Sequence, residues 1–380
     1  MASPERCETV MDHQPPPPLS HVLKLLYWRV RRDKRTTPHV AAVLFRFGRS
    51  FLTLWLGKYV GRARSPTMAI ALIEHLGDIV AAEPVARAAR RRFPRHRIVW
   101  LVKSAYAELP ASYPPVDRVV TVRCLTETML LRACGLFDEV WDLHLSGRAC
   151  ERCRIPLVRP GHGPDTATYY RFGNLITAQC LSAGIPLVPG GPVLSPPSHA
   201  VAKVNRLGLP TRFVAIHCMS NERARDWPVA CWRRLVAAIT GDLSVDVIEV
   251  GLRPLVIEHD GERARSLCGK LSIMETAEVI RRAALFVGID SGPAHLANAV
   301  GTQGVVLFGP FLGLDDYMPY SGGYQDGGTA DLLRAAGTLE DLPVEIVLGV
   351  VARRLRGVAK LDQPAAIQRS NTGRPGCGAE

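Results

Sequence analysis

The chain has 380 residues, 47% hydrophobic and 22% charged, a composition typical of a soluble globular protein with a large core. This length exceeds one ordinary domain and favours two domains with tails. The net charge of +12 comes largely from arginine-rich clusters at 29–35, 87–97 and 353–356. Such clusters favour anionic partners, namely a phosphorylated substrate, an acidic membrane surface or nucleic acid, although solvated helix faces explain them equally well. No aromatic and basic reading surface is apparent, so we expect no nucleic-acid partner.

The first 65 residues precede any α/β pattern. Residues 1–18 end in four prolines and are expected to be disordered, whereas residues 19–65 form a basic and apolar extension. Arg46 and Arg49 interrupt its apolar run at 40–60. Because each arginine would cost at least about 2.5 kcal/mol near the bilayer centre, we do not expect a spanning helix. Residues 19–64 are instead expected either to lie at a membrane interface or to pack against the first domain.

The cysteines bear on compartment and metal binding. Ten cysteines are unevenly spaced, and the N-terminus lacks the basic and apolar regions of a signal peptide, so we expect a reduced, cytoplasmic protein. Cys150 and Cys153 form one Cys-x-x-Cys pair without a second pair at zinc-finger spacing, although Cys124 and Cys134 lie upstream. We expect plain thiols, no metal and no cofactor, while metal binding by Cys150 and Cys153 stays open.

Alternating strands and helices predict a first domain at 66–185. We expect strands at 68–73, 97–102, 116–122 and 140–145, and helices at 78–92 and 167–183. Pro84 lies inside the first of these helices and should delay its start or bend it. The alternation predicts a parallel, doubly wound sheet.

A linker at 186–200 and a second α/β domain at 201–357 follow. The stretch 184–197 holds five prolines and three glycines and is expected to act as a hinge. Residues 358–380 are expected to be a flexible tail. Strands are predicted at 213–217, 245–250, 285–289 and 305–308, and helices at 227–239, 277–284, 294–300 and 344–356.

The stretch 285–310 predicts a phosphate site. A buried strand at 285–289 breaks at Asp290, Ser291, Gly292 and Pro293, and a helix ending at Gly301 follows. This turn would direct the backbone N–H groups of Ser291 and Gly292 outward at the carboxyl edge of a parallel sheet, where they can bind phosphate. An ordinary helix capped by Ser291 is the alternative.

Two further loops fall at strand ends. Asp78 follows the first strand and could accept a proton from an attacking hydroxyl; a helix N-cap is the alternative role. In the loop 217–228, Ser220 and Asn221 could bond phosphate oxygens, and Arg225 could hold a pyrophosphate with its planar fork. A surface salt bridge is the alternative for Arg225.

Two blocks of this sequence resemble the family 9 glycosyltransferases, typified by the ADP-heptose:lipopolysaccharide heptosyltransferases. The first block is Leu76-Gly77-Asp78-Ile79-Val80 with Pro84 and Arg92-Phe93-Pro94. The second covers 217–310 and includes Arg225-Asp226-Trp227-Pro228 and Asp290-Ser291-Gly292-Pro293-Ala294-His295. Together they span about a third of the chain and occur in the family's order. The resemblance implies the GT-B fold, in which two Rossmann-like domains face a cleft.

The resemblance also implies residue roles. Asp78 matches the general base, with Gly77 and His75 on the acceptor side, and Arg225 matches a residue that meets the diphosphate. The other implied donor-binding residues are Ser220, Asn221, Asp290, Ser291, Gly292, His295 and, as weaker matches, Asp260 at the ribose and Leu271 at the adenine. Glu74 and His75 stand where relatives often carry basic or small polar residues, which puts a phosphorylated lipopolysaccharide acceptor in doubt.

We therefore expect an enzyme, an inverting and metal-independent glycosyltransferase. It would move a sugar, with ADP-heptose as the candidate donor, to a glycan or lipid-linked acceptor in cell-envelope polysaccharide synthesis. It would work in the cytoplasm or at the inner face of the plasma membrane. A non-catalytic nucleotide-sugar-binding partner protein and a nucleotide-sugar epimerase of similar architecture are the alternatives. The donor, the acceptor and the oligomeric state stay open.

Overall fold

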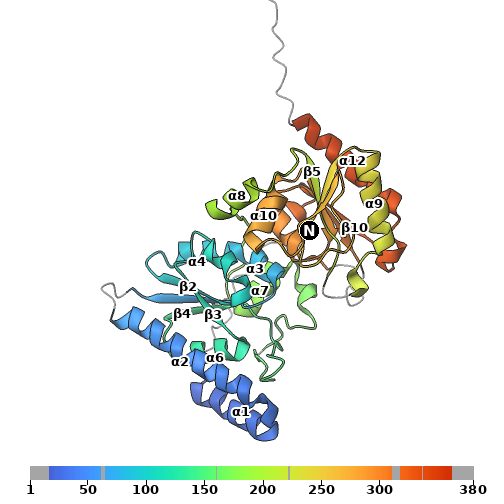
Figure 1. Cartoon of the computed structure of the whole chain (residues 1–380). Coiled ribbons are helices and arrows are strands. Elements are labelled where there is room, and N and C mark those ends of the chain that lie inside the picture. The colour runs from blue at the N-terminus through green and yellow to red at the C-terminus, as the bar shows by residue number, and fades with distance from the viewer. Residues whose placement is uncertain are drawn as a thin grey trace, which may run out of the picture.

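The computed structural model describes residues 17–60, 65–159, 161–220, 223–309, 317–335 and 337–361. Two separate β-sheets, each with helices on both faces, lie one after the other along the chain (Figure 1). The strand order is β3-β2-β1-β4 in the first sheet and β10-β9-β8-β5-β6-β7 in the second. Every strand pair is parallel. The predicted α/β class with two doubly wound sheets is confirmed.

The first sheet forms because each strand is apolar on both faces. Met68 and Ile70 face one helical layer together with Trp100, while Ala71 and Leu101 face the opposite layer. The strands are β1 (Thr67–Ala71), β2 (Arg97–Lys103), β3 (Arg118–Val122) and β4 (Glu139–Asp142), and the helices are α3 (Leu76–Ala81), α4 (Glu83–Arg92), α5 (Glu108–Ala111), α6 (Leu125–Ala133) and α7 (Leu175–Ala183).

The N-terminal extension supplies part of the outer helical layer of this sheet. It forms α1 (Leu19–Arg32), a 3-10 turn (Lys34–Thr36) and α2 (Thr37–Tyr59). Arg46 Nη2 donates to the carbonyl of Thr121 at 2.9 Å, and Lys58 Nζ donates to the carbonyl of Leu136 at 2.9 Å. The extension therefore packs against the first domain, which was one of the two arrangements expected from the sequence.

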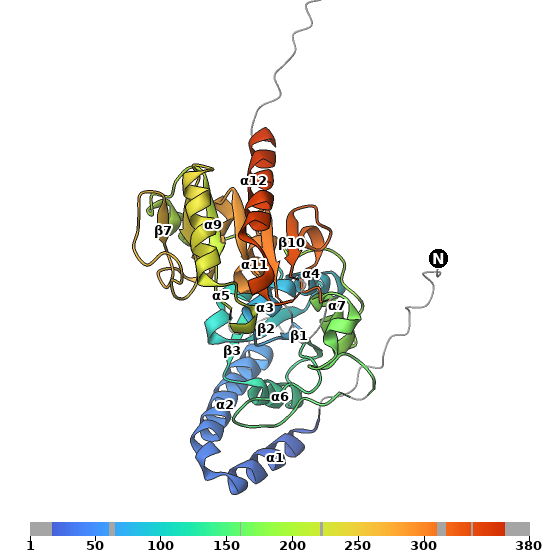
Figure 2. The ribbon, with the colours of Figure 1, turned by 90° about the vertical axis from the view of Figure 1, so that its right-hand side faces the viewer.

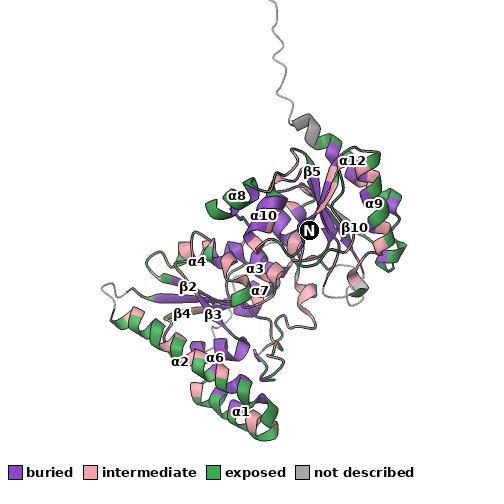
Figure 3. Cartoon of the chain, viewed as in Figure 1, coloured by how far each residue is buried: buried purple, intermediate pink, exposed green. Residues whose placement is uncertain are grey.

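The outward side of the same two helices is largely exposed (Figure 3), and several of its exposed side chains are apolar. Phe45 is 74% exposed and Leu52 is 55% exposed on α2. Among the described residues, the segment Lys34–Tyr59 is the one helical stretch that is long and apolar enough to cross a membrane, judged by length and composition alone.

The second domain repeats the architecture with six strands. Its sheet has apolar layers on both faces, one continuous with the core of the first domain. The strands are β5 (Phe213–His217), β6 (Asp246–Glu249), β7 (Ala264–Ser266), β8 (Leu285–Ile289), β9 (Gly304–Phe308) and β10 (Ala330–Arg334), and the helices are α8 (Ser198–Asn205), α9 (Val229–Gly241), α10 (Ile273–Arg282), α11 (Gly292–Ala299) and α12 (Val344–Leu361).

Several predicted elements differ from the observed ones. Pro84 does break the first helix, since α3 stops at Ala81 and α4 starts at Glu83 with the proline in its first turn. The helix predicted at 167–183 is wrong in its first half, because Gly173 has a φ of 91° and α7 begins only after the N-cap Asn174. Helix α12 continues past residue 357 into the predicted tail. The predicted disorder at 1–16 and 362–380 lies outside the described residues.

The linker between the domains is bonded to both. Arg87 on α4 donates to the carbonyl of Gly191 at 2.8 Å, and Leu194 N donates to the carbonyl of Ala299 at the end of α11 at 2.8 Å. The linker thus follows the junction of the two domains. Its predicted hinge role and the predicted domain limits stay predictions.

Candidate functional site

Helix α3, which follows β1, lies against α11, which follows β8 (Figure 2). Two glycines allow this close approach. A Cβ on Gly77 would stand 2.6 Å from Cδ2 of His295, and a Cβ on Gly292 would overlap Leu76. Both β1 and β8 border the point where the strand order of their sheet reverses, which is where open α/β sheets bind ligands.

Asp78 occupies the first turn of α3, at the third helical position and not at the predicted N-cap. Its carboxylate accepts a hydrogen bond from the backbone N–H of His75 at 3.0 Å and lies 3.5 Å from Nδ1 of the same residue. The side chain is 28% exposed. Burial raises the pKa of Asp78, but the hydrogen bonds and charge of His75 outweigh it and hold the pKa below its usual range. Asp78 is therefore ionised at neutral pH.

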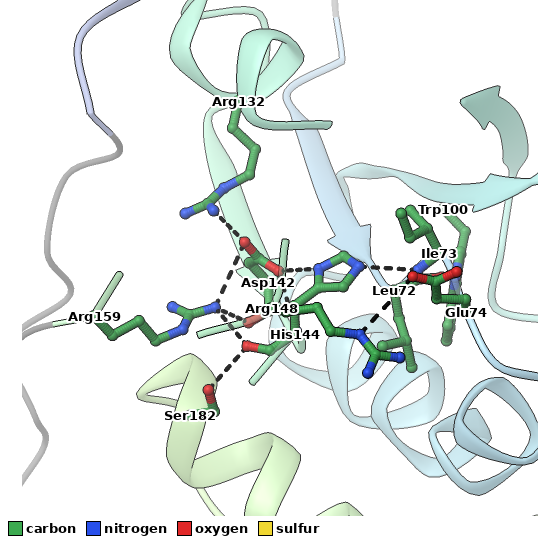
Figure 4. A network of polar contacts seen from close by, with 10 residues as sticks. All are labelled: Leu72, Ile73, Glu74, Trp100, Arg132, Asp142, His144, Arg148, Arg159 and Ser182. Carbon is green, nitrogen blue, oxygen red and sulfur yellow. Dashed lines mark hydrogen bonds and ion pairs between the residues drawn. The ribbon is translucent and has the colours of Figure 1, made fainter. Parts of the chain in front are cut away.

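A buried polar network fixes the loop that leads to Asp78 (Figure 4). Asp142, at the end of β4, contacts Nδ1 of His144 at 2.5 Å, and Nε2 of His144 accepts the backbone N–H of Ile73 at 3.1 Å. Arg132 and Arg159 flank Asp142 and hold its pKa far below its usual range despite burial. The network anchors the backbone just before the loop.

Arg148 joins this loop to the segment after β4. Its Nη2 lies 3.1 Å from Nδ1 of His75, and its Nε lies 3.8 Å from the carboxylate of Glu74, which also pairs with Lys103. His75 is 55% exposed, so it forms the outer rim of the loop. The two predicted acceptor-side residues therefore differ in position. Gly77 lies in the contact between α3 and α11, whereas His75 lies at the surface.

The start of α11 is not capped by a side chain. Ser291 is the N-cap residue, yet its hydroxyl accepts no bond from the N–H groups of the helix and instead contacts Nδ1 of His217 and the carbonyl of Ile289, each at 3.0 Å. Within the described residues, no partner accepts the backbone N–H of Ser291 or Gly292. Burial lowers the pKa of His217 to about 4, so this histidine is neutral. Two unpaired amides at a helix start are suited to bind an anion.

Arg225 and Asp290 form a partly buried pair beside this end. Arg225 Nη2 donates to the backbone carbonyl of Asp290 at 2.8 Å and also to its carboxylate. The other carboxylate oxygen of Asp290 accepts the hydroxyl of Tyr320 at 2.8 Å. The salt bridge that was predicted as the alternative role of Arg225 is thus present. It is not a surface salt bridge, however, because the arginine side chain is only 21% exposed.

The charges of Asp78, Asp290 and Arg225 act on one set of aromatic side chains, namely Tyr169, Tyr317 and His295. Burial raises the pKa of Tyr169 to about 12, with Asp78 and Asp290 adding to the effect and Arg225 opposing it. The same three charges act on Tyr317 and on His295, whose pKa is lowered chiefly by burial. The first-domain carboxylate and the second-domain pair are therefore within electrostatic reach of each other.

Sequence reasoning missed these aromatic groups. The rings of Tyr169 and Tyr317 lie 6.2 Å apart, and those of His295 and Tyr320 lie 4.6 Å apart. Tyr169 comes from the segment before α7, far in sequence from the others, and no local pattern marks it. The phosphate motif did identify His295, which lies buried with no bonded partner for Nδ1 among the described residues.

The remaining predicted donor residues follow β5 or precede α10. The backbone N–H of Ser220 bonds the carboxylate of Asp226 at 2.7 Å, and Asn221 lies outside the described residues. Asp260 is exposed and accepts the backbone N–H of Ser266 at 2.9 Å, so it also stabilises its own loop. Leu271 is half-buried just before α10.

A first-domain carboxylate caps the start of α10. Glu108 accepts the backbone N–H of Ile273 at 2.6 Å and the hydroxyl of Ser272 at 3.0 Å. This bond links the two domains beside Leu271, so the start of α10 is already occupied by an acidic group. Of the two second-domain helices α10 and α11, α10 has this acidic cap from the first domain, whereas no side chain caps the start of α11.

Metal ligands gather elsewhere. Within the described ranges, one group of side chains could hold a metal ion, namely His39, Cys124, Cys150 and Cys153. It includes neither Asp78 nor Asp290. A cavity of about 330 Å³ also lies apart from the predicted residues and is lined in part by Arg91, Arg92 and Trp141. The expected absence of a metal is thus left open by the structure.

Comparison with known proteins shows a likeness to one family and a shared fold. Residues 196–312 match glycosyltransferase family 9 (heptosyltransferase). Lipopolysaccharide heptosyltransferase 1 of Escherichia coli K12 is 23% identical over 284 residues, covering 62% of this chain and 85% of the relative.

Two solved structures share the fold. The family 9 glycosyltransferase of Veillonella parvula aligns with a TM-score of 0.60 at 16% identity, covering 77% of this chain and 97% of that one. The ADP-heptose lipopolysaccharide heptosyltransferase II of E. coli aligns with a TM-score of 0.56 at 16% identity, covering 77% and 99%. The predicted GT-B architecture is confirmed.

Proposed function

The chain is a heptosyltransferase-like relative of glycosyltransferase family 9, and from this premise we propose that it transfers a sugar from a nucleotide-diphosphate donor with inversion and without a metal ion. ADP-heptose is the proposed donor, and a glycan or lipid-linked acceptor of lipopolysaccharide synthesis is the proposed acceptor. The observation that carries the proposal is the juxtaposition of ionised Asp78 with the uncapped start of α11 across the contact of the two domains.

The second domain would stabilise the departing diphosphate. The backbone N–H groups of Ser291 and Gly292 would bond phosphate oxygens, and the charge of Arg225 would balance the negative charge that develops as the sugar bond breaks. His217 keeps the Ser291 hydroxyl turned away from the helix, so this hydroxyl does not compete for the amides. Asp290 and Tyr320 would hold the guanidinium in place.

The first domain would supply the base. The Asp78 carboxylate would accept the proton of the acceptor hydroxyl as its oxygen attacks the anomeric carbon from the face opposite the diphosphate. One displacement of this kind inverts the anomeric configuration. The low pKa of Asp78 keeps the carboxylate ionised at neutral pH, and the network around Asp142 and His144 holds its loop in place.

Acceptor recognition would fall to the rim of the same loop. His75 and Arg148 are partly exposed there, next to Glu74 and Lys103. This mixed rim offers both donors and acceptors of hydrogen bonds, which suits the hydroxyl groups of a sugar chain.

We also propose that α1 and α2 bring the enzyme to the inner face of the plasma membrane. The outward side of α2 exposes six apolar side chains, and α1 adds Tyr27 and Trp28 with Arg31 stacked near both rings. Exposed apolar patches flanked by basic residues bind membrane interfaces. The six side chains on α2 are Leu44, Phe45, Leu52, Trp55, Leu56 and Tyr59.

Vesicle sedimentation tests the membrane proposal. We expect the full chain to sediment with vesicles that contain anionic lipid, and the double variant Phe45→Glu, Trp55→Glu to stay in solution. Leu252→Glu, which changes an exposed leucine on the second domain, is the control. Equal sedimentation of all three proteins would contradict the proposed contact.

Donor and stereochemistry are tested together. Thermal unfolding with ADP-, GDP- and UDP-sugars should show stabilisation by the ADP-sugar, about 2.7 kcal/mol at 100 times its dissociation constant. NMR of the product should show an inverted anomeric centre in reactions to which no metal ion has been added. Donor binding without transfer to any acceptor would support a non-catalytic partner protein, and isomerisation of the donor alone would support an epimerase; either outcome refutes the proposal.

A further inference from the structure

Four metal-binding atoms converge on the face of the first sheet that α1 and α2 cover. They come from three segments: the first turn of α2 carries His39, the N-cap of α6 is Cys124, and a turn after β4 carries Cys150 and Cys153. One imidazole nitrogen and three sulfur atoms all lie within 4.8 Å of one another. The sequence marked the pair at 150 and 153, but only the fold adds the other two ligands.

The distances fit a tetrahedral centre. Zinc bonds sulfur at about 2.3 Å and nitrogen at about 2.0–2.1 Å, so the edge between a sulfur and a nitrogen of the tetrahedron is about 3.6 Å. Nε2 of His39 lies 3.5 Å from Sγ of Cys150. Three cysteines and one histidine are also a ligand set that zinc takes in structural sites.

The turn at 150–153 is preformed. The backbone N–H of Cys153 donates to Sγ of Cys150 at 3.5 Å, and the backbone N–H of Arg154 donates to the carbonyl of Cys150 at 2.7 Å. A β-bridge between Ala149 and Pro156 closes the base of this small hairpin. Both sulfur atoms are thus presented from one rigid turn, and an N–H bond to sulfur stabilises a thiolate ligand.

Burial closes the cluster to solvent. Cys124, Cys153 and His39 are buried and Cys150 is half-buried, among the apolar side chains of α2, α6 and the sheet. Isolated buried thiols pack as small hydrophobic groups, but packing alone does not require three thiols and an imidazole at one point. Four protein ligands with little access for water are typical of structural centres, and catalytic centres keep one position open.

We propose that His39, Cys124, Cys150 and Cys153 bind one thiophilic divalent ion, with zinc as the expected ion, in a structural centre that fastens the N-terminal helices to the first domain. Arg123 Nε lies 3.4 Å from Nδ1 of His39. Metal binding at Nε2 places the ring proton on Nδ1, so the Arg123 side chain has to leave this contact in the metal-bound protein. Arg29 of α1 already bonds the carbonyl of Arg152 within the metal-binding turn at 3.2 Å.

The centre also reaches the catalytic loop. The hairpin with Cys150 and Cys153 carries Arg148, which contacts His75 and Glu74 beside Asp78. Loss of the ion should therefore loosen the attachment of α1 and α2 and the position of Arg148. The ion itself lies outside the proposed transfer step.

Metal content of the full-length protein, purified under reducing conditions without chelator, tests the proposal. We expect about one zinc per chain, and after exchange with cobalt the visible absorption of tetrahedral Co²⁺ with thiolate charge-transfer bands. Cys150→Ser and Cys153→Ser should each lose the ion. Cys134→Ser, at the other end of α6 and outside the cluster, should keep it.

Two further measurements keep the proposal falsifiable if a serine variant fails to fold. The cobalt spectrum of the unaltered chain requires no substitution, and His39→Cys should retain the ion with four thiolate ligands. If the purified protein contained iron in place of zinc, the proposed metal centre would stand, with iron as its ion. A metal-free protein without the cobalt bands, or a disulfide between two of these cysteines in the reduced preparation, would overturn the proposal.

Discussion

The starts of α3 and α11 are the same structural unit used in two ways. Each helix follows a buried strand at the point where its sheet reverses order, and the two helices lie against each other. In α3 the first turn carries its own carboxylate, since Asp78 accepts the N–H of His75. In α11 the N-cap hydroxyl points elsewhere and two amides stay unpaired among the described residues. This local difference underlies the two proposed roles, a proton acceptor at the start of α3 and an anion site at the start of α11.

Removing the charge of Asp78, at the start of α3, should have the largest effect on the rate of transfer. In Asp78→Asn we expect transfer to fall by roughly 10² to 10⁴-fold, because general base catalysis is lost. Donor affinity should change little, since the donor binds the other helix. Initial rates and thermal shifts with the donor separate the two effects. The control is Asp242→Asn at the end of α9, and unchanged transfer in Asp78→Asn would refute the base assignment.

Changing the cation beside the anion site should have the next largest effect. Arg225→Lys keeps the charge but loses the planar fork, so kcat/KM should fall by about 10 to 100-fold, or about 1.4 to 2.8 kcal/mol. Arg234→Lys, in an exposed ion pair with Glu345, should have no effect. If both substitutions leave the kinetics unchanged, Arg225 does not meet the diphosphate.

Spreading the two helices apart should cost stability and activity together. Gly77→Ala places a methyl group 2.6 Å from the His295 ring, which is buried and packs against Tyr320, so it has little room to move. We expect a loss of about 1–3 kcal/mol in the free energy of unfolding, typical of overpacking. Gly241→Ala at the end of α9 has open space around it and serves as the control. An equally stable and active Gly77→Ala protein would show that the helix contact is not required.

The smallest effect concerns the pH profile. His75→Gln removes the charge and side-chain contact that lower the pKa of Asp78, so this pKa should rise. The base works only when ionised; activity is present above its pKa and lost as pH falls through it. The acid limb of kcat/KM should therefore move to higher pH, while rates near neutral pH stay within tenfold. The exposed His162→Gln is the control, and an acid limb that does not move would mean that Asp78 does not set it.

Local patterns predicted the strands and the loops of this site well. The strands at 213–217 and 285–289 have the predicted bounds, because continuous apolar runs bounded by polar breaks suit buried parallel strands. Asp78 and Ser291 were found because loops at the carboxyl ends of parallel strands lie at the ligand edge. The alternative role predicted for Asp78, a helix N-cap, is three positions away from its observed place at the third residue of α3.

Contacts between distant segments could not be predicted in this way. Tyr169 and Tyr317 meet only because the two domains close on each other. His39 joins Cys124, Cys150 and Cys153 only because α2 packs on the first sheet, and its own helix shows no metal-binding spacing. The break at Gly173 was missed because apolar residues on both sides continued the helical pattern.

A crystal structure of the full chain with ADP tests the division of roles most directly. We predict that diphosphate oxygens lie within hydrogen-bond distance of the backbone nitrogen atoms of Ser291 and Gly292, with Arg225 beside them and the Asp78 carboxylate free of the nucleotide. A diphosphate bound at the arginine-lined cavity of Arg91 and Arg92, or at the start of α3, would contradict the account.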